Sequence, residues 1–186
     1  MGIRLLCVAS ITVGSIALFA CSAAPQTPQE RLELTVDSTA AISNFTAQDP
    51  SLADLLKDSD GYAIFPEVGK GAVAVGASYG QGEVWEGGKR IGFADMTAAT
   101  IGASFGAQTF AELIVFRTPA ASRRFQSGQF TFDAGASAVV LKAGAANDVK
   151  WENDIAVFVD PKGGLMADAS IGGQQFKFTT WSQANQ

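Results

Sequence analysis

The chain has 186 residues and a formal net charge of −5, because 18 acidic side chains outnumber 13 basic ones. It contains no histidine and only two cysteines, which excludes a Ser-His-Asp triad and leaves too few ligands for the usual zinc sites. An acidic chain without a basic run is also a poor candidate for binding nucleic acid.

The N-terminal stretch has the pattern of a secretory signal peptide. Arg4 is the only charged residue before Glu30, and residues 5–20 are almost all apolar or small. The apolar run is short for a spanning helix, which needs about 20 such residues. We expect a signal peptide over residues 1–20, and the alternative is an uncleaved anchor helix.

The end of this stretch resembles a bacterial lipobox. Residues 18–21 read Leu-Phe-Ala-Cys, and the cysteine thiol of a lipobox receives a diacylglyceryl group. We therefore expect Cys21 to be lipidated and residues 21–28 to form a tether. Phe19 stands where the pattern usually has a small residue, so cleavage after Ala24, with loss of Cys21, is the alternative.

The cysteines and the residue after the lipobox indicate the compartment. Cys7 lies in the expected signal peptide, so acylation of Cys21 would leave the mature chain without a thiol for a disulfide. Ser22 stands where an inner-membrane retention signal would have aspartate. In a bacterium with two membranes, this favours a lipid anchor in the outer membrane, facing the periplasm.

Residues 29–58 are predicted to form an N-terminal helical segment. A capping box at residues 27–30, with proline at the first helical position, starts a helix that runs to about Phe45. A second, short helix is expected to begin at Asp49-Pro50 and to end by Gly61. The apolar residues of the two helices are Leu32, Val36, Ala40 and Ile42 in the first and Leu52, Leu55 and Leu56 in the second.

Residues 59–181 are predicted to form a β-rich domain, followed by a tail at residues 182–186. Glycine pairs at 87–88 and 172–173 are hairpin signals, and residues 160–163 predict a turn. Apolar runs predict central strands at 113–116 and 155–159, and alternating patterns predict half-buried strands at 165–171 and 175–179.

One helix is expected to interrupt the β domain. Thr118 caps it, Pro119 occupies its first position and Gly128 ends it. Together these elements predict an α+β fold. It consists of a mostly antiparallel, curved or barrel-like sheet, N-terminal helices and this one interrupting helix.

Two segments match the G-x-S-x-G pattern of serine hydrolases, at residues 76–80 and 102–106. A serine needs a base to become a nucleophile, and a chain without histidine lacks the usual one. Residues 58–60 begin like a calcium loop, but the later glycine and glutamate of that loop are missing. We therefore expect no catalytic residue, no metal site and no cofactor.

Six segments in order carry a resemblance to a known family. The first is residues 61–71, GYAIFPEVGKG. The others are GASYGQG at 76–82, GASFGAQ at 102–108, FQSGQFTF at 125–132, DAGAS at 133–137 and GLMADASIG at 164–172. Over about residues 60–178 the chain resembles the SYLF domain, which occurs in eukaryotic endocytic adaptors and in bacterial lipoproteins.

The resemblance implies a non-enzymatic, lipid-binding domain. In eukaryotic members, phosphatidylinositol lipids bind largely through a basic segment before the conserved core, and actin is a further partner. The matching region of this chain, residues 30–60, is acidic and has only Arg31 and Lys57 as cations.

Three functional hypotheses follow. The first is a membrane-anchored lipoprotein of the bacterial envelope that binds lipid or another amphiphile in an apolar groove, with a few cations fixing the head group. The alternative is a structural protein that binds another envelope protein through an apolar surface. A buried cluster of carboxylates with perturbed pKa values would instead indicate an enzyme. The expected ligand-binding cations are Lys70, Lys89, Arg90, Arg123 and Arg124.

Overall fold

The computed structural model describes residues 25–70, 76–100, 109–128, 131–132, 137–162, 169–170 and 173–184. The expected signal peptide, Cys21 and the segments at 102–108, 133–136 and 164–168 lie outside these residues, as do Gly172 and the side chain of Lys70.

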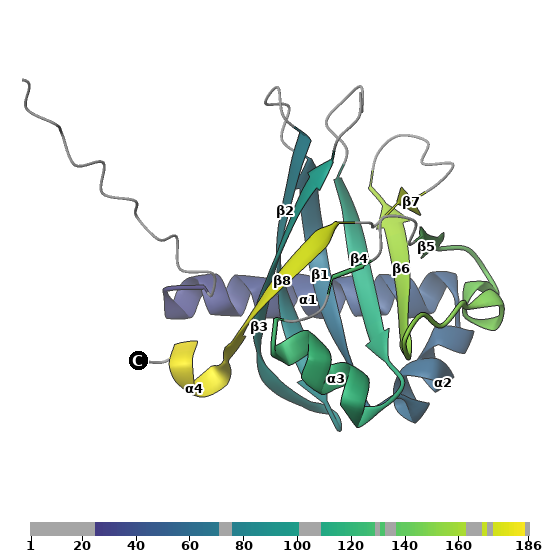
Figure 1. Ribbon diagram of the computed structural model, residues 1–186, viewed down its shortest axis with the longest axis horizontal. Helices are drawn as coiled ribbons and strands as arrows, with labels where there is room; N and C mark the ends of the chain where they lie inside the picture. Colours follow the sequence, from purple (N-terminus) through teal and green to yellow (C-terminus); the bar gives the residue numbers. More distant parts are fainter. Residues whose placement is uncertain are drawn as a thin grey trace, which may run out of the picture.

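The described elements confirm the α+β class (Figure 1). The helices are α1 (Pro28–Gln48), α2 (Ser51–Asp58), α3 (Pro119–Gln126) and α4 (Trp181–Ala184), with a 3-10 turn, η1, at Ala145–Asp148. The strands are β1 (Gly61–Lys70), β2 (Gly76–Glu86), β3 (Lys89–Thr100), β4 (Thr109–Phe116), β5 (Ser137–Val140), β6 (Ile155–Pro161), β7 (Ala169–Ser170) and β8 (Gln174–Thr180).

The strands form one sheet in the order β7-β5-β6-β4-β1-β2-β3-β8. The described strands pair antiparallel except β5 and β6, which run parallel, so the sheet is mixed. The order is linear and the described strands do not close into a barrel. The sheet nevertheless bends over itself, because the Phe176 ring of β8 lies 5.9 Å from the Phe65 ring of β1.

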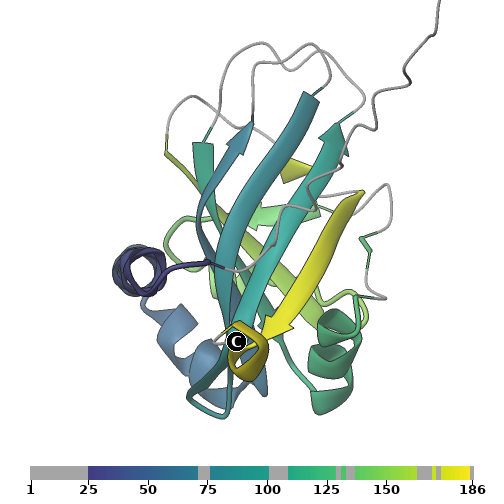
Figure 2. The same ribbon diagram turned by 90° about the vertical axis from the view of Figure 1, so that its left-hand side faces the viewer.

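Helices cover both faces of the sheet. Figure 2 views α1 nearly end-on and shows α1 and α3 on opposite sides of the strands. On the concave face, α3 packs Phe125 against Phe116 and Phe176, with ring centroids 4.9 Å apart in both pairs. On the other face, Phe45 of α1 and Leu52 of α2 pack with Ile64 and Leu113 of the sheet. The N-terminal helices therefore share an apolar core with the β domain.

Several local predictions are confirmed. Thr27 and Glu30 form the capping box at the start of α1. Gly87 and Gly88 form the β2–β3 hairpin turn with φ values of 54° and 73°, a left-handed conformation that glycine adopts easily. Thr118 caps α3, and Gly128 follows its end with φ 67°.

Two predictions need correction. The expected turn at 160–163 starts later, because Asp160 and Pro161 still pair with Ala111 and Phe110 of β4. The expected apolar side of α1 is turned outward: Leu32 is 64% exposed and Val36 is 59% exposed. The buried side of α1 consists of Leu34, Ser38, Ala41 and Phe45.

Candidate functional site

The outer face of β1 and β2 passes beneath α1, and two cavities lie along this junction. The cavities form because α1 presents small side chains, Ser38 and Ala41, between the larger Leu34 and Phe45. Small residues leave space between a helix and a sheet that larger side chains would fill. The two cavities are therefore candidate binding sites.

The first cavity, which we call the aromatic cavity, has a volume of about 210 Å³. Its floor is buried and its rim consists of exposed or half-buried side chains. Ser38, Ile64 and Glu83 form the floor, and Thr39, Ile42, Tyr62 and Trp85 form the rim. The Tyr62 and Trp85 rings, which face each other across the β1–β2 ladder, stack with centroids 6.2 Å apart and planes 9° apart.

Glu83 is fully buried and has a specific partner for each carboxylate oxygen. Its Oε1 accepts from the Thr35 hydroxyl at 2.7 Å and forms an ion pair with the Arg90 guanidinium. Its Oε2 accepts from the Trp85 indole N–H at 3.3 Å. A buried charge with these partners is compensated, whereas a buried charge without them costs several kcal/mol.

Tyr62 borders the same buried charge. Burial of the ring and, to a smaller extent, the negative charge of Glu83 raise the pKa of the Tyr62 hydroxyl above its ordinary value. The hydroxyl therefore stays neutral at physiological pH. The aromatic cavity combines one compensated carboxylate, neutral hydroxyl groups and apolar walls.

The second cavity lies on the other side of α1 and has a volume of about 330 Å³. It is mixed in charge. It is lined by Asp37, Ala40, Ala41, Asn44, Pro66, Glu67, Ala111 and Lys162. Asn44 is held in place by donating to Asp160 Oδ2 at 2.6 Å. The charged residues of this cavity are exposed and hydrated. They would therefore bind a ligand less specifically than the buried groups of the aromatic cavity.

The five expected ligand-binding cations do not gather at either cavity. Lys70 ends β1, at the opposite end of that strand from the β2–β3 hairpin that carries Lys89. Arg123 is exposed on α3, and Arg124 donates to the Asn153 carbonyl oxygen. α3 lies on the sheet face opposite α1 (Figure 2).

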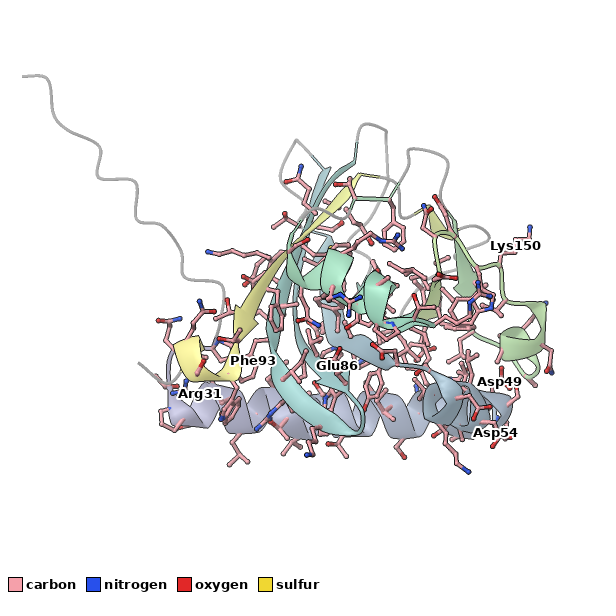
Figure 3. All side chains as sticks on the ribbon, turned by 60° about the horizontal axis from the view of Figure 1, so that its bottom comes forward. Arg31, Asp49, Asp54, Glu86, Phe93 and Lys150 are labelled. Atoms are coloured by element: carbon pink, nitrogen blue, oxygen red, sulfur yellow. The ribbon has the colours of Figure 1, made fainter. Side chains whose placement is uncertain are left out.

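Arg90 is the expected cation that lies nearest to the aromatic cavity, but it is occupied. Besides Glu83, its guanidinium contacts the Thr35 hydroxyl and lies over the Trp181 ring, 4.1 Å from the ring centroid. Phe93 lies beside this group, and Figure 3 shows Phe93 near the start of α1 and α4. The structure therefore gives Arg90 a structural role in joining α1, β3 and α4.

Two buried acids of the described residues have raised pKa values, but they do not form a cluster. Burial raises the pKa of Glu112 to about 7 and that of Asp95 to about 6. Glu112 lies on the concave side of β4, whereas Asp95 lies beside Phe93 and Thr97 on the convex side of β3. Across the described ranges, no three acidic, histidine or cysteine side chains are placed to hold a metal ion.

Sequence reasoning missed the residues that define the two cavities. Ser38 and Glu83 looked like ordinary polar residues, and Lys162 was assigned to a turn. The pairing of Tyr62 with Trp85 depends on the β1–β2 register, which the predicted β2–β3 turn at Gly87-Gly88 does not determine. Within the described residues, no helix is long and apolar enough to cross a membrane. No protein-family model matches the chain, and no curated protein matches it.

Proposed function

We propose that this protein is a lipoprotein of the bacterial envelope, anchored through acyl chains on Cys21, whose SYLF-type domain binds membrane lipid without catalysing a reaction. The expected lipobox supports the anchor, and the six ordered segments support the domain assignment. The lipobox, with Ser22 after the cysteine, favours the outer membrane, facing the periplasm.

The main structural support for this proposal is the outward side of α1. The residues that point away from the sheet lie at helical spacing and form what we call the outward ridge. All are exposed and none is charged: Pro28, Gln29, Leu32, Val36, Ser43 and Ala47. Figure 3 shows α1 with side chains projecting away from the strands.

The place of the ridge in the chain explains how a small apolar surface can serve lipid binding. Six residues lie between Cys21 and Pro28, so these two positions are at most about 25 Å apart when the chain is extended. A short tether makes the second contact intramolecular and raises its effective concentration. Leu32 and Val36 each contribute about 1–2 kcal/mol when they leave water, so a weak surface is sufficient once the anchor is inserted.

The same ridge would also fit an apolar groove on another envelope protein, which keeps the structural alternative open. The two functions differ in what they require. Lipid binding needs only a bilayer, whereas the alternative needs a protein partner and gives no direct affinity for vesicles.

Flotation of vesicles separates the two. Because the chain from residue 21 onward with Cys21→Ser lacks both the apolar signal segment and the acyl anchor, it reports only the affinity of the domain. We expect it to float weakly with vesicles of zwitterionic and anionic phospholipid, and Leu32→Glu with Val36→Glu to abolish flotation. The matched control adds two glutamates at exposed alanines elsewhere, Ala120→Glu and Ala143→Glu, and should float normally. No flotation by a folded parent chain would favour the protein-partner alternative.

A further inference from the structure

The rim of the aromatic cavity can be reached from solvent, whereas its floor is buried. The side chains of the rim are exposed or half-buried: Thr39, Ile42, Tyr62 and Trp85. A molecule that enters the cavity meets these side chains first. The chemistry of a ligand is therefore inferred here from the rim and not from the polar groups of the floor.

The rim carries no charge. The Thr39 hydroxyl donates to the Thr35 carbonyl oxygen at 2.8 Å, and the raised pKa of Tyr62 keeps its hydroxyl neutral. The Trp85 indole N–H is directed inward to Glu83, which is fully buried and already paired. Because placing an ionic group against such a surface costs its hydration without giving it a partner, the rim favours an uncharged, apolar part of a ligand.

The apolar wall of the cavity is formed before a ligand binds. The Tyr62 and Trp85 rings stack with their planes 9° apart, and the hydrogen bond to Glu83 holds the Trp85 indole in place. Ile42 of α1 adds a branched aliphatic side chain to the same cavity. A preformed wall needs little ordering of side chains on binding, which favours ligands held mainly by apolar contact.

The volume of the cavity limits what it can hold. It measures about 210 Å³, and a methylene group takes up roughly the volume of one water molecule in the liquid, about 30 Å³. The cavity therefore has room for about seven methylene groups. This suits part of one alkyl chain and excludes the two chains of a phospholipid.

The cavity opens beside the outward ridge. Thr39 of the rim follows Val36 by three residues and precedes Ser43 by four, and residues at these spacings are neighbours on a helix surface. Val36 and Ser43 belong to the ridge. A domain that rests on a bilayer through the ridge would therefore hold the rim at the membrane surface, where the alkyl chains of membrane lipids are within reach.

We propose that the aromatic cavity binds the alkyl chain of a single-chain membrane lipid, which packs on Ile42, Tyr62 and Trp85 while its head group stays in water outside the rim. The inference rests on the lipid-binding function proposed above and names the kind of lipid that the domain takes up. The second cavity does not suit this ligand, because Asp37, Glu67 and Lys162 line it.

A chain-length series tests the proposal. Uncharged n-alkyl glucosides of about four to ten carbons, each below its critical micelle concentration, are titrated into the chain from residue 21 onward with Cys21→Ser. The indole N–H signals are followed by NMR, and those of Trp151 and Trp181, which do not line the cavity, are the internal control.

The affinity should depend on chain length only until the cavity is full. We expect a saturable shift of the Trp85 signal and an affinity that rises about two- to fourfold per carbon up to about seven carbons, and then by less than about 1.5-fold per carbon. An affinity that rises steadily to the longest chain, equal shifts of all three indole signals, or no saturable shift of Trp85 overturns the proposal.

Two opposite changes at Ile42 locate the site. Ile42→Ala enlarges the cavity and should move the limit to chains longer by about two or three carbons, whereas Ile42→Trp fills it and should weaken octyl glucoside at least about fivefold. Ser43→Ala, on the outward ridge, is the control and should change neither value. An unchanged limit in a folded Ile42→Ala variant, checked by circular dichroism, contradicts the proposal.

Vesicle flotation separates this proposal from the function on which it rests. Ile42→Ala should float like the parent chain, because it leaves the outward ridge intact. Leu32→Glu with Val36→Glu should abolish flotation but bind octyl glucoside like the parent chain. Loss of octyl glucoside binding in that double variant would show that the ridge and not the cavity takes up the alkyl chain.

Discussion

The Gln174 side chain donates from Nε2 to Glu112 Oε2 at 2.8 Å, although three strands separate β8 from β4 in the sheet. The bond therefore crosses the concave interior and joins two distant parts of the bent sheet. Both residues are buried, and each keeps one side-chain oxygen, Oε1, without a hydrogen-bond partner among the described residues. Such a site favours the neutral form of the carboxyl group.

Glu112 should make the protein less stable as the pH rises. Burial raises its pKa to about 7 from an ordinary value of 4.5. Because the folded state then binds the proton more tightly than the unfolded state, stability is fully present below about pH 4.5 and is lost toward pH 7 and above. The loss is at most roughly 3 kcal/mol, since one pKa unit corresponds to 1.36 kcal/mol.

Glu112→Gln should flatten this pH dependence. We expect its free energy of unfolding, from urea titrations between pH 5 and 8, to exceed that of the parent protein most clearly at pH 8. Asp95→Asn serves as the comparison, because burial raises the pKa of Asp95 to about 6, so it should remove a smaller part of the slope. A parent protein that becomes more stable between pH 5 and 8 would contradict this account.

Gly92 should tolerate no side chain. A Cβ atom at this position of β3 would collide with the Thr179 carbonyl oxygen and approach the Phe178 ring at 2.7 Å. Since both belong to the paired strand β8, Gly92→Ala should destabilise the protein by about 1–3 kcal/mol through overpacking. Gly69→Ala is the control, because its Cβ would meet no atom within 4 Å. Equal unfolding midpoints of the two variants would show that β8 can move away.

Arg90 should act as a structural residue. Arg90→Ala leaves the fully buried Glu83 without its charge partner and removes packing on Trp181. We expect a loss of about 2–4 kcal/mol in the free energy of unfolding. Lys89→Ala, the exposed neighbour, should change it by less than about 0.5 kcal/mol. A stable Arg90→Ala variant that loses only lipid binding would restore the role expected from the sequence.

The orientation of α1 could not be predicted from the sequence, whereas several local features could. The capping box, the α3 boundaries and the β2–β3 turn were predictable because each depends on residues within a few positions. The buried side of α1 was not, because its two long sides have similar polarity: Leu32 and Val36 compete with Leu34 and Phe45. The choice depends on the space that Ile64 and Leu113 leave for Phe45, which only the folded sheet defines.

The candidate sites could not be predicted from the sequence for the same reason. The partners Glu83 with Arg90, and Glu112 with Gln174, meet through strand pairing and sheet curvature, and no local spacing marks them. The antiparallel strands around β4 were predictable from their apolar runs. The parallel β5–β6 pair was not, because it requires a crossover whose geometry leaves no short motif.

Phe45 should be important for the packing of α1 against the sheet. It is fully buried between α2 and the sheet, so Phe45→Ala should cost about 3–5 kcal/mol and expose the helix amides to hydrogen exchange. Val36→Ala, on the outward ridge, should cost less than about 0.5 kcal/mol. The reverse ranking would mean that α1 lies with its other side on the sheet.

Lipid binding by the domain should depend little on salt. The net charge of the chain is −5, and the exposed cations Lys89, Arg123 and Arg124 do not join the outward ridge. Surface charges are screened over about 8–10 Å at physiological ionic strength, so broad attraction to anionic vesicles is weak. In flotation assays between 50 and 500 mM NaCl, roughly spanning Debye lengths from 14 to 4 Å, we expect less than about a twofold change in the bound fraction. Arg123→Glu with Arg124→Glu should reduce binding only modestly, whereas loss of binding at moderate salt would reveal a basic surface assembled by the fold.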